Sequence, residues 1–159
     1  MEIISKTPIW VFILFIVLVI VGLLQLRDRN VSLQKAIILP ISMICLSFYG
    51  LISAFGLEVK SIFCWLIGLI IAVLLNLLLK LPKNSTYDTE LKIFFIKGSI
   101  IPFILIMIIF FTKYFVAVVI AKHLAILNEL SFICGISFIY GVLSGLFFGR
   151  IFILLKLIK

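Results

Sequence analysis

The chain has few charged residues and very few acidic ones. Asp, Glu, Lys and Arg make up 13% of the 159 residues, and Asp and Glu together account for 6 of them. The chain is 65% hydrophobic, whereas a soluble domain is about 45–50% apolar and about 25% charged. Low charge combined with long apolar runs is typical of an integral membrane protein. The net charge of +8 comes from short basic clusters between these runs, which indicates membrane topology and contact with anionic phospholipids rather than nucleic acid.

Cysteine and histidine are also scarce. Cys45, Cys64 and Cys134 lie singly within apolar segments, and His123 lies in a polar connection. Because no CxxC or Cys/His spacing occurs, the sequence predicts no metal site and no cofactor. The cysteines are interpreted as small buried apolar side chains. No nucleophile, acid/base pair or metal cluster converges, so we expect a protein that is not an enzyme.

Long apolar runs dominate the rest of the chain. Five of them approach the ~20 residues that a helix needs to cross about 30 Å of hydrocarbon. They cover about 8–26, 36–56, 62–80, 100–121 and 133–150. A single span in lipid satisfies its backbone polar groups only as a helix. The sequence therefore predicts an all-α fold, in which residues 1–159 form one integral membrane bundle of five transmembrane helices.

The basic residues predict the orientation of this bundle. On one side of the predicted membrane lie Arg27, Arg29, Lys35, Lys80, Lys83, Lys92, Lys97, Arg150, Lys156 and Lys159, and on the other lie Lys6, Lys60 and Lys122. Cytoplasmic loops are enriched in Lys and Arg, so we expect the N-terminus outside and the C-terminus in the cytoplasm. The loop 82–99 is then cytoplasmic, and its segment "LKIFFIK" is predicted to lie along the interface as a strand or short helix. Arg27, Arg29 and Lys35 are candidate contacts for lipid headgroups.

Small residues in the apolar runs predict where helices pack. Gly141, Gly145 and Gly149 recur every fourth residue in "YGVLSGLFFG". Gly50 and Gly68 occupy similar rows in the second and third runs. In lipid, helices associate through close backbone approach at such residues. We interpret the stripe as an intramolecular packing surface, with a homodimer interface as the alternative.

One lysine lies inside an apolar run. Lys113 is near the middle of "IIFFTKYFVAVV", and facing lipid there would cost roughly 2.5–3.5 kcal/mol. We therefore expect it to face the bundle and to hydrogen-bond with the polar side chains at matching depth, which are Tyr49, Tyr140 and Ser137. Two interpretations stay open beside a lipid-facing lysine: a structural contact that fixes helix rotation, and a binding site for an anionic or carbonyl-bearing substrate or a lipid headgroup.

Several stretches together resemble a known family. They are "TPIWVF", "LQLRDRNVSLQKAIILPISMICLSFYG", "KGSIIPFILIMIIFFTKY" and "YGVLSGLFFGR". They resemble a domain of unknown function found in small multi-span proteins of the bacterial inner (cytoplasmic) membrane. That resemblance implies a location and a size but no activity. The "VSLQKAIILP" stretch alone is also similar to proteins associated with cytochrome c biogenesis.

Two classes of function remain after these exclusions. The first is a small-solute or anion transporter or binding subunit that uses the buried lysine–tyrosine site. The alternative is a non-catalytic structural or accessory membrane protein, such as an assembly or cytochrome c biogenesis factor. Carboxylates, which coupled carriers usually place within their spans, are absent from the apolar runs.

Overall fold

The computed structural model describes residues 8–79, 86–88, 91 and 93–156, and is mostly helical. Its long helices are α2 (Ile9–Leu24), α3 (Leu33–Phe55), α4 (Val59–Leu79), α5 (Ile101–Ala121) and α6 (Leu130–Lys156). A short 3-10 helix, η1 (Ala125–Asn128), precedes α6. Lys6, Lys80, Lys83, Lys92 and Lys159, which entered the predicted orientation, lie outside the described residues.

Four of the helices, α3 to α6, are long and apolar enough to cross a membrane. The prediction of a helical protein with several membrane-compatible segments is therefore confirmed. The first predicted span, 8–26, is a shorter apolar helix of 16 residues, which is about 24 Å long at 1.5 Å per residue.

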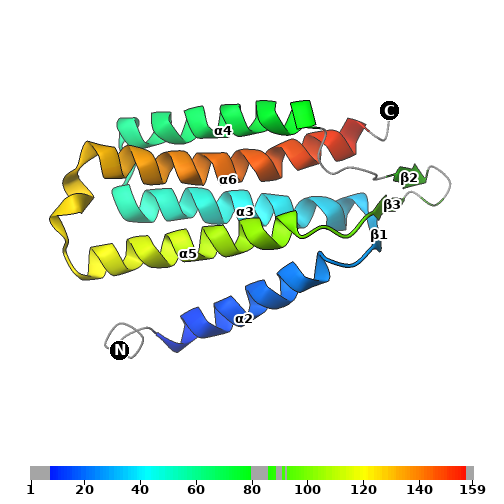
Figure 1. The fold of residues 1–159 in the computed structure, drawn as a ribbon, viewed down its shortest axis with the longest axis horizontal. Helices are drawn as coiled ribbons and strands as arrows, with labels where there is room; N and C mark the ends of the chain where they lie inside the picture. Colours follow the sequence, from blue (N-terminus) through cyan, green and yellow to red (C-terminus); the bar gives the residue numbers. More distant parts are fainter. Residues whose placement is uncertain (1–7, 80–85, 89–90, 92, 157–159) are drawn as a thin grey trace.

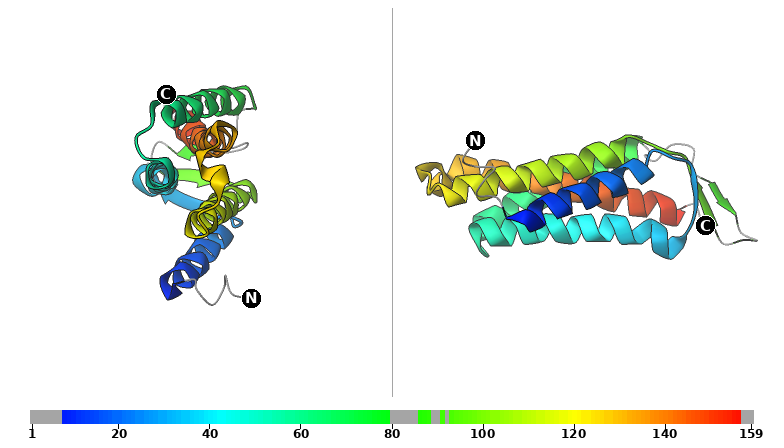
Figure 2. Two further views of the ribbon diagram at one scale, coloured as in Figure 1. Left: turned by 90° about the vertical axis from the view of Figure 1, so that its left-hand side faces the viewer. Right: turned by 90° about the horizontal axis from the view of Figure 1, so that it is seen from below.

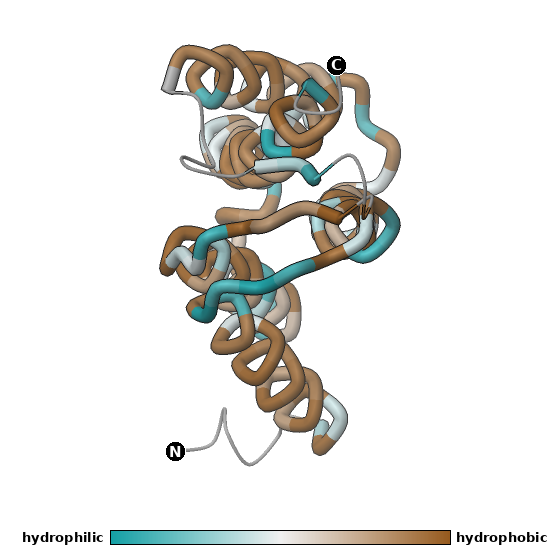
Figure 3. The backbone as a smooth tube through the Cα atoms, turned by 90° about the vertical axis from the view of Figure 1, so that its right-hand side faces the viewer, coloured by the Kyte–Doolittle hydropathy of each residue, from teal (hydrophilic) through white to brown (hydrophobic). Residues whose placement is uncertain are grey.

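The helices lie side by side along one long axis (Figure 1). Viewed along that axis, α4 and α2 lie at opposite edges, with α3, α5 and α6 between them (Figure 2). α6 packs against both α4 and α3, and α2 packs against α5. The end that carries the strands is called the sheet end below, and the end that carries η1 is called the loop end. Hydrophilic residues gather in the connections at the sheet end, while the helices behind them are mostly hydrophobic (Figure 3).

A three-stranded antiparallel sheet caps one end of the bundle. Its strands are β1 (Arg29–Ser32), β2 (Thr86–Asp88) and β3 (Ile93–Ile96), in the order β1-β3-β2. The all-α prediction is therefore incomplete, although "LKIFFIK" does contain a strand. In β3, Phe94 and Ile96 are buried while Phe95 is exposed, which is the alternation of a half-buried strand. Phe94 and Ile96 pack with Ala36 of α3 and Leu154 of α6, so the sheet closes over the helix ends.

Glycines bring α6 into close contact with α4. A methyl group added at Gly141 would collide with the carbonyl oxygen of Trp65, and one added at Gly145 would collide with that of Leu69. The same approach involves Gly68, which faces the backbone of Phe138, and Gly149, which faces the side chain of Asn76. Gly50 lies in a different contact, between α3 and the ring of Tyr140 on α6. The small-residue stripe is therefore occupied within one chain.

A buried amide also joins α4 and α6. Asn76 is 3% exposed, and its Nδ2 donates a hydrogen bond of 2.7 Å to the carbonyl oxygen of Leu146. The Asn76 side chain reaches this carbonyl because the neighbouring glycines let the two helix backbones approach each other closely. The interface thus combines close packing with a polar contact that fixes the register of the two helices.

Candidate functional site

Lys113 is a cation located near the middle of an apolar helix. It lies two residues beyond the midpoint of α5 (Ile101–Ala121), or about 3 Å along the axis at 1.5 Å per residue. Its side chain is half-buried, and its Nζ lies 4.5 Å from the centroid of the Tyr49 ring on α3. A lysine over an aromatic face is attracted by the ring quadrupole, by up to about 2 kcal/mol where water is excluded.

The ammonium group of Lys113 keeps its donors free within the described part of the chain. It makes no hydrogen bond and no ion pair there, so the hydrogen bonds predicted with phenols and hydroxyls are replaced by contact with a ring face. A lysine ammonium has three N–H donors, and a ring face satisfies these less completely than oxygen acceptors do. Tyr49 is 64% exposed, so this contact lies at the side of the bundle rather than deep in its core.

Tyr140 and Ser137 lie in the core instead. Both are 0% exposed on α6, and neither hydroxyl has a hydrogen-bond partner among the described residues. The ring of Tyr140 lies against Gly50, the residue that follows Tyr49. The backbone carbonyl of Tyr140 accepts a 2.8 Å hydrogen bond from the Ser47 hydroxyl. Lys113 and Tyr49 therefore form one group, while Tyr140 and Ser137 form a second, buried group at a similar level.

No acidic side chain lies near the middle of the described helices α3 to α6. Asp28 and Asp88 belong to the sheet end, and Glu58 and Glu129 belong to the loop end. Among the described residues, His, Cys, Asp and Glu do not gather in groups of three or more that could hold a metal ion. The charge of Lys113 is consequently offset by no carboxylate of the helices that surround it.

The candidate headgroup residues occupy the sheet end in two different settings. Arg27 and Lys35 are exposed there, whereas Arg29 is half-buried. Burial lowers the pKa of the Arg29 guanidinium from its ordinary value, because removal from water disfavours the charged form. Only Arg27 and Lys35 are thus freely available at the surface.

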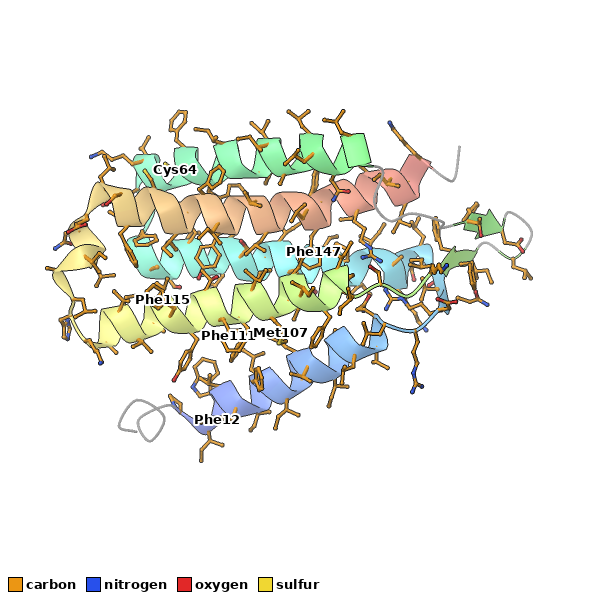
Figure 4. All side chains as sticks on the ribbon, viewed as in Figure 1. Phe12, Cys64, Met107, Phe111, Phe115 and Phe147 are labelled. Atoms are coloured by element: carbon orange, nitrogen blue, oxygen red, sulfur yellow. The ribbon has the colours of Figure 1, made fainter. Side chains whose placement is uncertain are left out.

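A close pair of cysteines was not predicted from the sequence. The Sγ atoms of Cys64 on α4 and Cys134 on α6 lie 2.6 Å apart, and both thiols are free. Figure 4 shows Cys64 on the side of α4 that faces α6 near the loop end. Each cysteine lies near the beginning of its predicted span, so the sequence indicates that the two lie at a similar depth in the membrane. Equal depth alone does not identify α4 and α6 as neighbours.

We expect mild oxidation to join Cys64 to Cys134 within one chain. Iodine or copper–phenanthroline should leave Cys45, which is exposed on α3, as the single thiol that reacts with an alkylating reagent, as counted by intact mass. The Cys45→Ser variant should cross-link equally well, and Cys64→Ser should not. If all 3 cysteines were still alkylated after oxidation, the packing of α4 on α6 would be wrong.

A known protein family covers the whole chain. A family model described as a family of unknown function (DUF6622) matches residues 1–159. The chain belongs to DUF6622. The prediction of membership in a family of unknown function is thereby confirmed. No curated protein and no solved structure matches this DUF6622 member.

Proposed function

We propose that this DUF6622 protein is a non-catalytic, five-span protein of a bacterial cytoplasmic membrane that binds a small anionic solute at Lys113 and Tyr49. The observation that carries the proposal is the half-buried ammonium of Lys113, which lies near mid-helix on the ring of Tyr49 without an oxyanion partner among the described residues. Ionisable residues inside a membrane are costly and mark binding sites or pathways more often than structural contacts. The site would serve a transporter or a binding subunit.

The distribution of charge supports the proposed orientation. At the sheet end the described chain carries Arg27, Arg29, Lys35, Lys97, Arg150 and Lys156. At the loop end, Lys60 and Lys122 are matched by Glu58 and Glu129. Since positively charged loops stay in the cytoplasm, the sheet end is assigned to the cytoplasmic side. α2 is assigned as a fifth span because it is apolar and packs against α5 at the edge of the bundle (Figure 1).

The side chains around Lys113 fit a small anion better than a large one. The ring of Tyr49 occupies one side of the ammonium, and α5 itself occupies another. A small anion can approach the remaining N–H donors and form charge-assisted hydrogen bonds in an apolar setting, where such bonds are strong. Large polyols with a carboxylate would have to bury many hydroxyl groups, which costs free energy without matching acceptors.

We expect small anions to stabilise the purified protein against heating through Lys113. At equal ionic strength, sodium nitrate should raise the unfolding temperature relative to sodium gluconate, by roughly 5–11 °C at a hundredfold excess over Kd. The Lys113→Met variant should lose this difference. Lys122→Met, which removes an exposed lysine at the end of α5, should keep it.

Two results separate the proposal from its alternatives. A nitrate effect of the same size in Lys113→Met would place anion binding elsewhere and contradict the proposal. An unfolding temperature that is independent of the anion, together with destabilisation by Lys113→Met, would instead support a structural role. Nitrate uptake by proteoliposomes then distinguishes a transporter from a binding subunit.

A further inference from the structure

Two arginines face the bundle at the sheet end. Arg29 on β1 is paired in register with Ile96 on β3, and Ile96 is 2% exposed. Residues opposite each other in an antiparallel pair project from the same face of the sheet. Arg29 therefore belongs to the face that packs on the helices, which explains why it is half-buried.

Arg150 reaches the same region from α6. It precedes Leu154 by four residues, so the two lie on the same side of the helix. Leu154 is 0% exposed and packs against Phe94 and Ile96 of the sheet. Arg150 is half-buried, and Leu154 shares a cluster with Ile96, the residue paired with Arg29, so both arginines belong to the region between α6 and the sheet. Figure 4 shows nitrogen-bearing side chains gathered where the helices meet the sheet.

The donors of this arginine pair are largely unused. Arg29 donates a hydrogen bond to Oε1 of Gln25, a buried side chain at the end of α2. Arg150 makes no hydrogen bond and no ion pair within the described part of the chain. The carboxylate of Asp28, which directly precedes Arg29, accepts a 2.7 Å hydrogen bond from the backbone N–H of Gly98 instead. Two adjacent cations removed from water are unfavourable unless an anion lies between them.

We propose that Arg29 and Arg150 together bind one phosphate-class oxyanion. A guanidinium presents a planar fork of N–H donors that matches phosphate oxygens in a bidentate manner. Arg27 and Lys35 at the same end are exposed and contribute only to the diffuse positive field around this pair. The oxyanion is either the phosphodiester of an anionic lipid headgroup or a free phosphate, and the site is separate from Lys113.

Thermal unfolding with two kinds of probe tests this site. In one arm, inorganic phosphate is titrated into protein held in phosphatidylcholine nanodiscs. In the other, phosphatidylcholine nanodiscs are compared with nanodiscs that contain phosphatidylglycerol, without phosphate. We expect Arg150→Gln to weaken the apparent affinity for phosphate at least tenfold if the wild type responds to phosphate, and to lose most of the shift in unfolding temperature if it responds to phosphatidylglycerol. Arg27→Gln, which removes an exposed charge nearby, should change either quantity less than twofold.

Further variants keep the outcome independent of folding defects. Without either probe, Arg150→Gln should be at least as stable as the wild type, because one of two repelling charges is gone. Arg29→Gln should lose the same response, and Lys113→Met should retain it in full. A response in the phosphatidylglycerol arm alone assigns a lipid headgroup, and a response in the phosphate arm assigns a free ligand. Equal responses of Arg150→Gln and Arg27→Gln, or no response of the wild type in either arm, would overturn the proposal.

Discussion

Replacing Gly141 with alanine should strongly destabilise the bundle, whereas the same replacement at Gly135 should not. The added methyl group at Gly141 would meet the carbonyl oxygen of Trp65 and the backbone of Leu69 on α4. Overpacking typically costs about 1–3 kcal/mol, and we expect the upper part of this range because the obstacle is backbone, which cannot rotate away. That corresponds to a fall of roughly 6–12 °C in the unfolding temperature.

Gly135 provides a matched control on the same helix. Nothing lies within 4 Å of a methyl group placed there. Alanine is favoured over glycine in a helix by about 1 kcal/mol, so Gly135→Ala should leave the protein unchanged or slightly more stable. Circular dichroism during heating in detergent measures both variants. Equal unfolding temperatures for the two alanine variants would mean that α4 does not pack on α6 at this glycine.

Removing the ring of Tyr49 should produce the other large loss of stability. Tyr49→Leu takes away the aromatic face that lies 4.5 Å from Nζ of Lys113 and leaves the ammonium beside hydrocarbon. We expect a cost of about 1–2 kcal/mol, which is the range for a cation–π contact with limited access to water. Tyr49→Phe keeps the ring face and should cost much less. The same heating experiment compares the two variants, and equal destabilisation would assign the contribution to the hydroxyl instead.

The helices could be predicted from the sequence because each one is a long apolar run. The residues at which the helices begin and end are harder to predict from the sequence. α3 begins at Leu33, next to Ser32 of β1, whereas its apolar run indicates a start at residue 36. The strand "RNVS" is short and polar, and it forms because Val31 pairs with Phe94 more than 60 positions away. A contact between segments so distant in sequence leaves no local periodicity to detect.

The spacing of Gly141, Gly145 and Gly149 indicated a close helix contact but not the partner helix. Any helix can fill a small-residue groove, and the choice of α4 depends on how all helices are arranged. The two arginines at the sheet end show a related limit. Arg150 ends the apolar run 133–150 and is therefore interpreted as a topology signal, yet its burial depends on the sheet that folds over Leu154.

The candidate site could be predicted in part, because depth along a helix follows from residue counting. Lys113 and Tyr49 lie at similar levels, and the structure places them in contact. Residue counting does not give the rotation of each helix about its axis. Tyr140 also lies at this level, but its ring faces Gly50 from within the core, and its side chain forms no hydrogen bond with Lys113.

A double-mutant cycle between Lys113 and Tyr49 tests the central claim most directly. The free energy of unfolding is measured for the wild type, Lys113→Met, Tyr49→Leu and the double variant under one set of conditions. If the ring shelters the ammonium, the coupling between the two substitutions should be about 1 kcal/mol or more, within the range found for residues in contact. Effects that add to within about 0.3–0.5 kcal/mol would mean that the two side chains do not interact, and the proposed binding site would be lost with them.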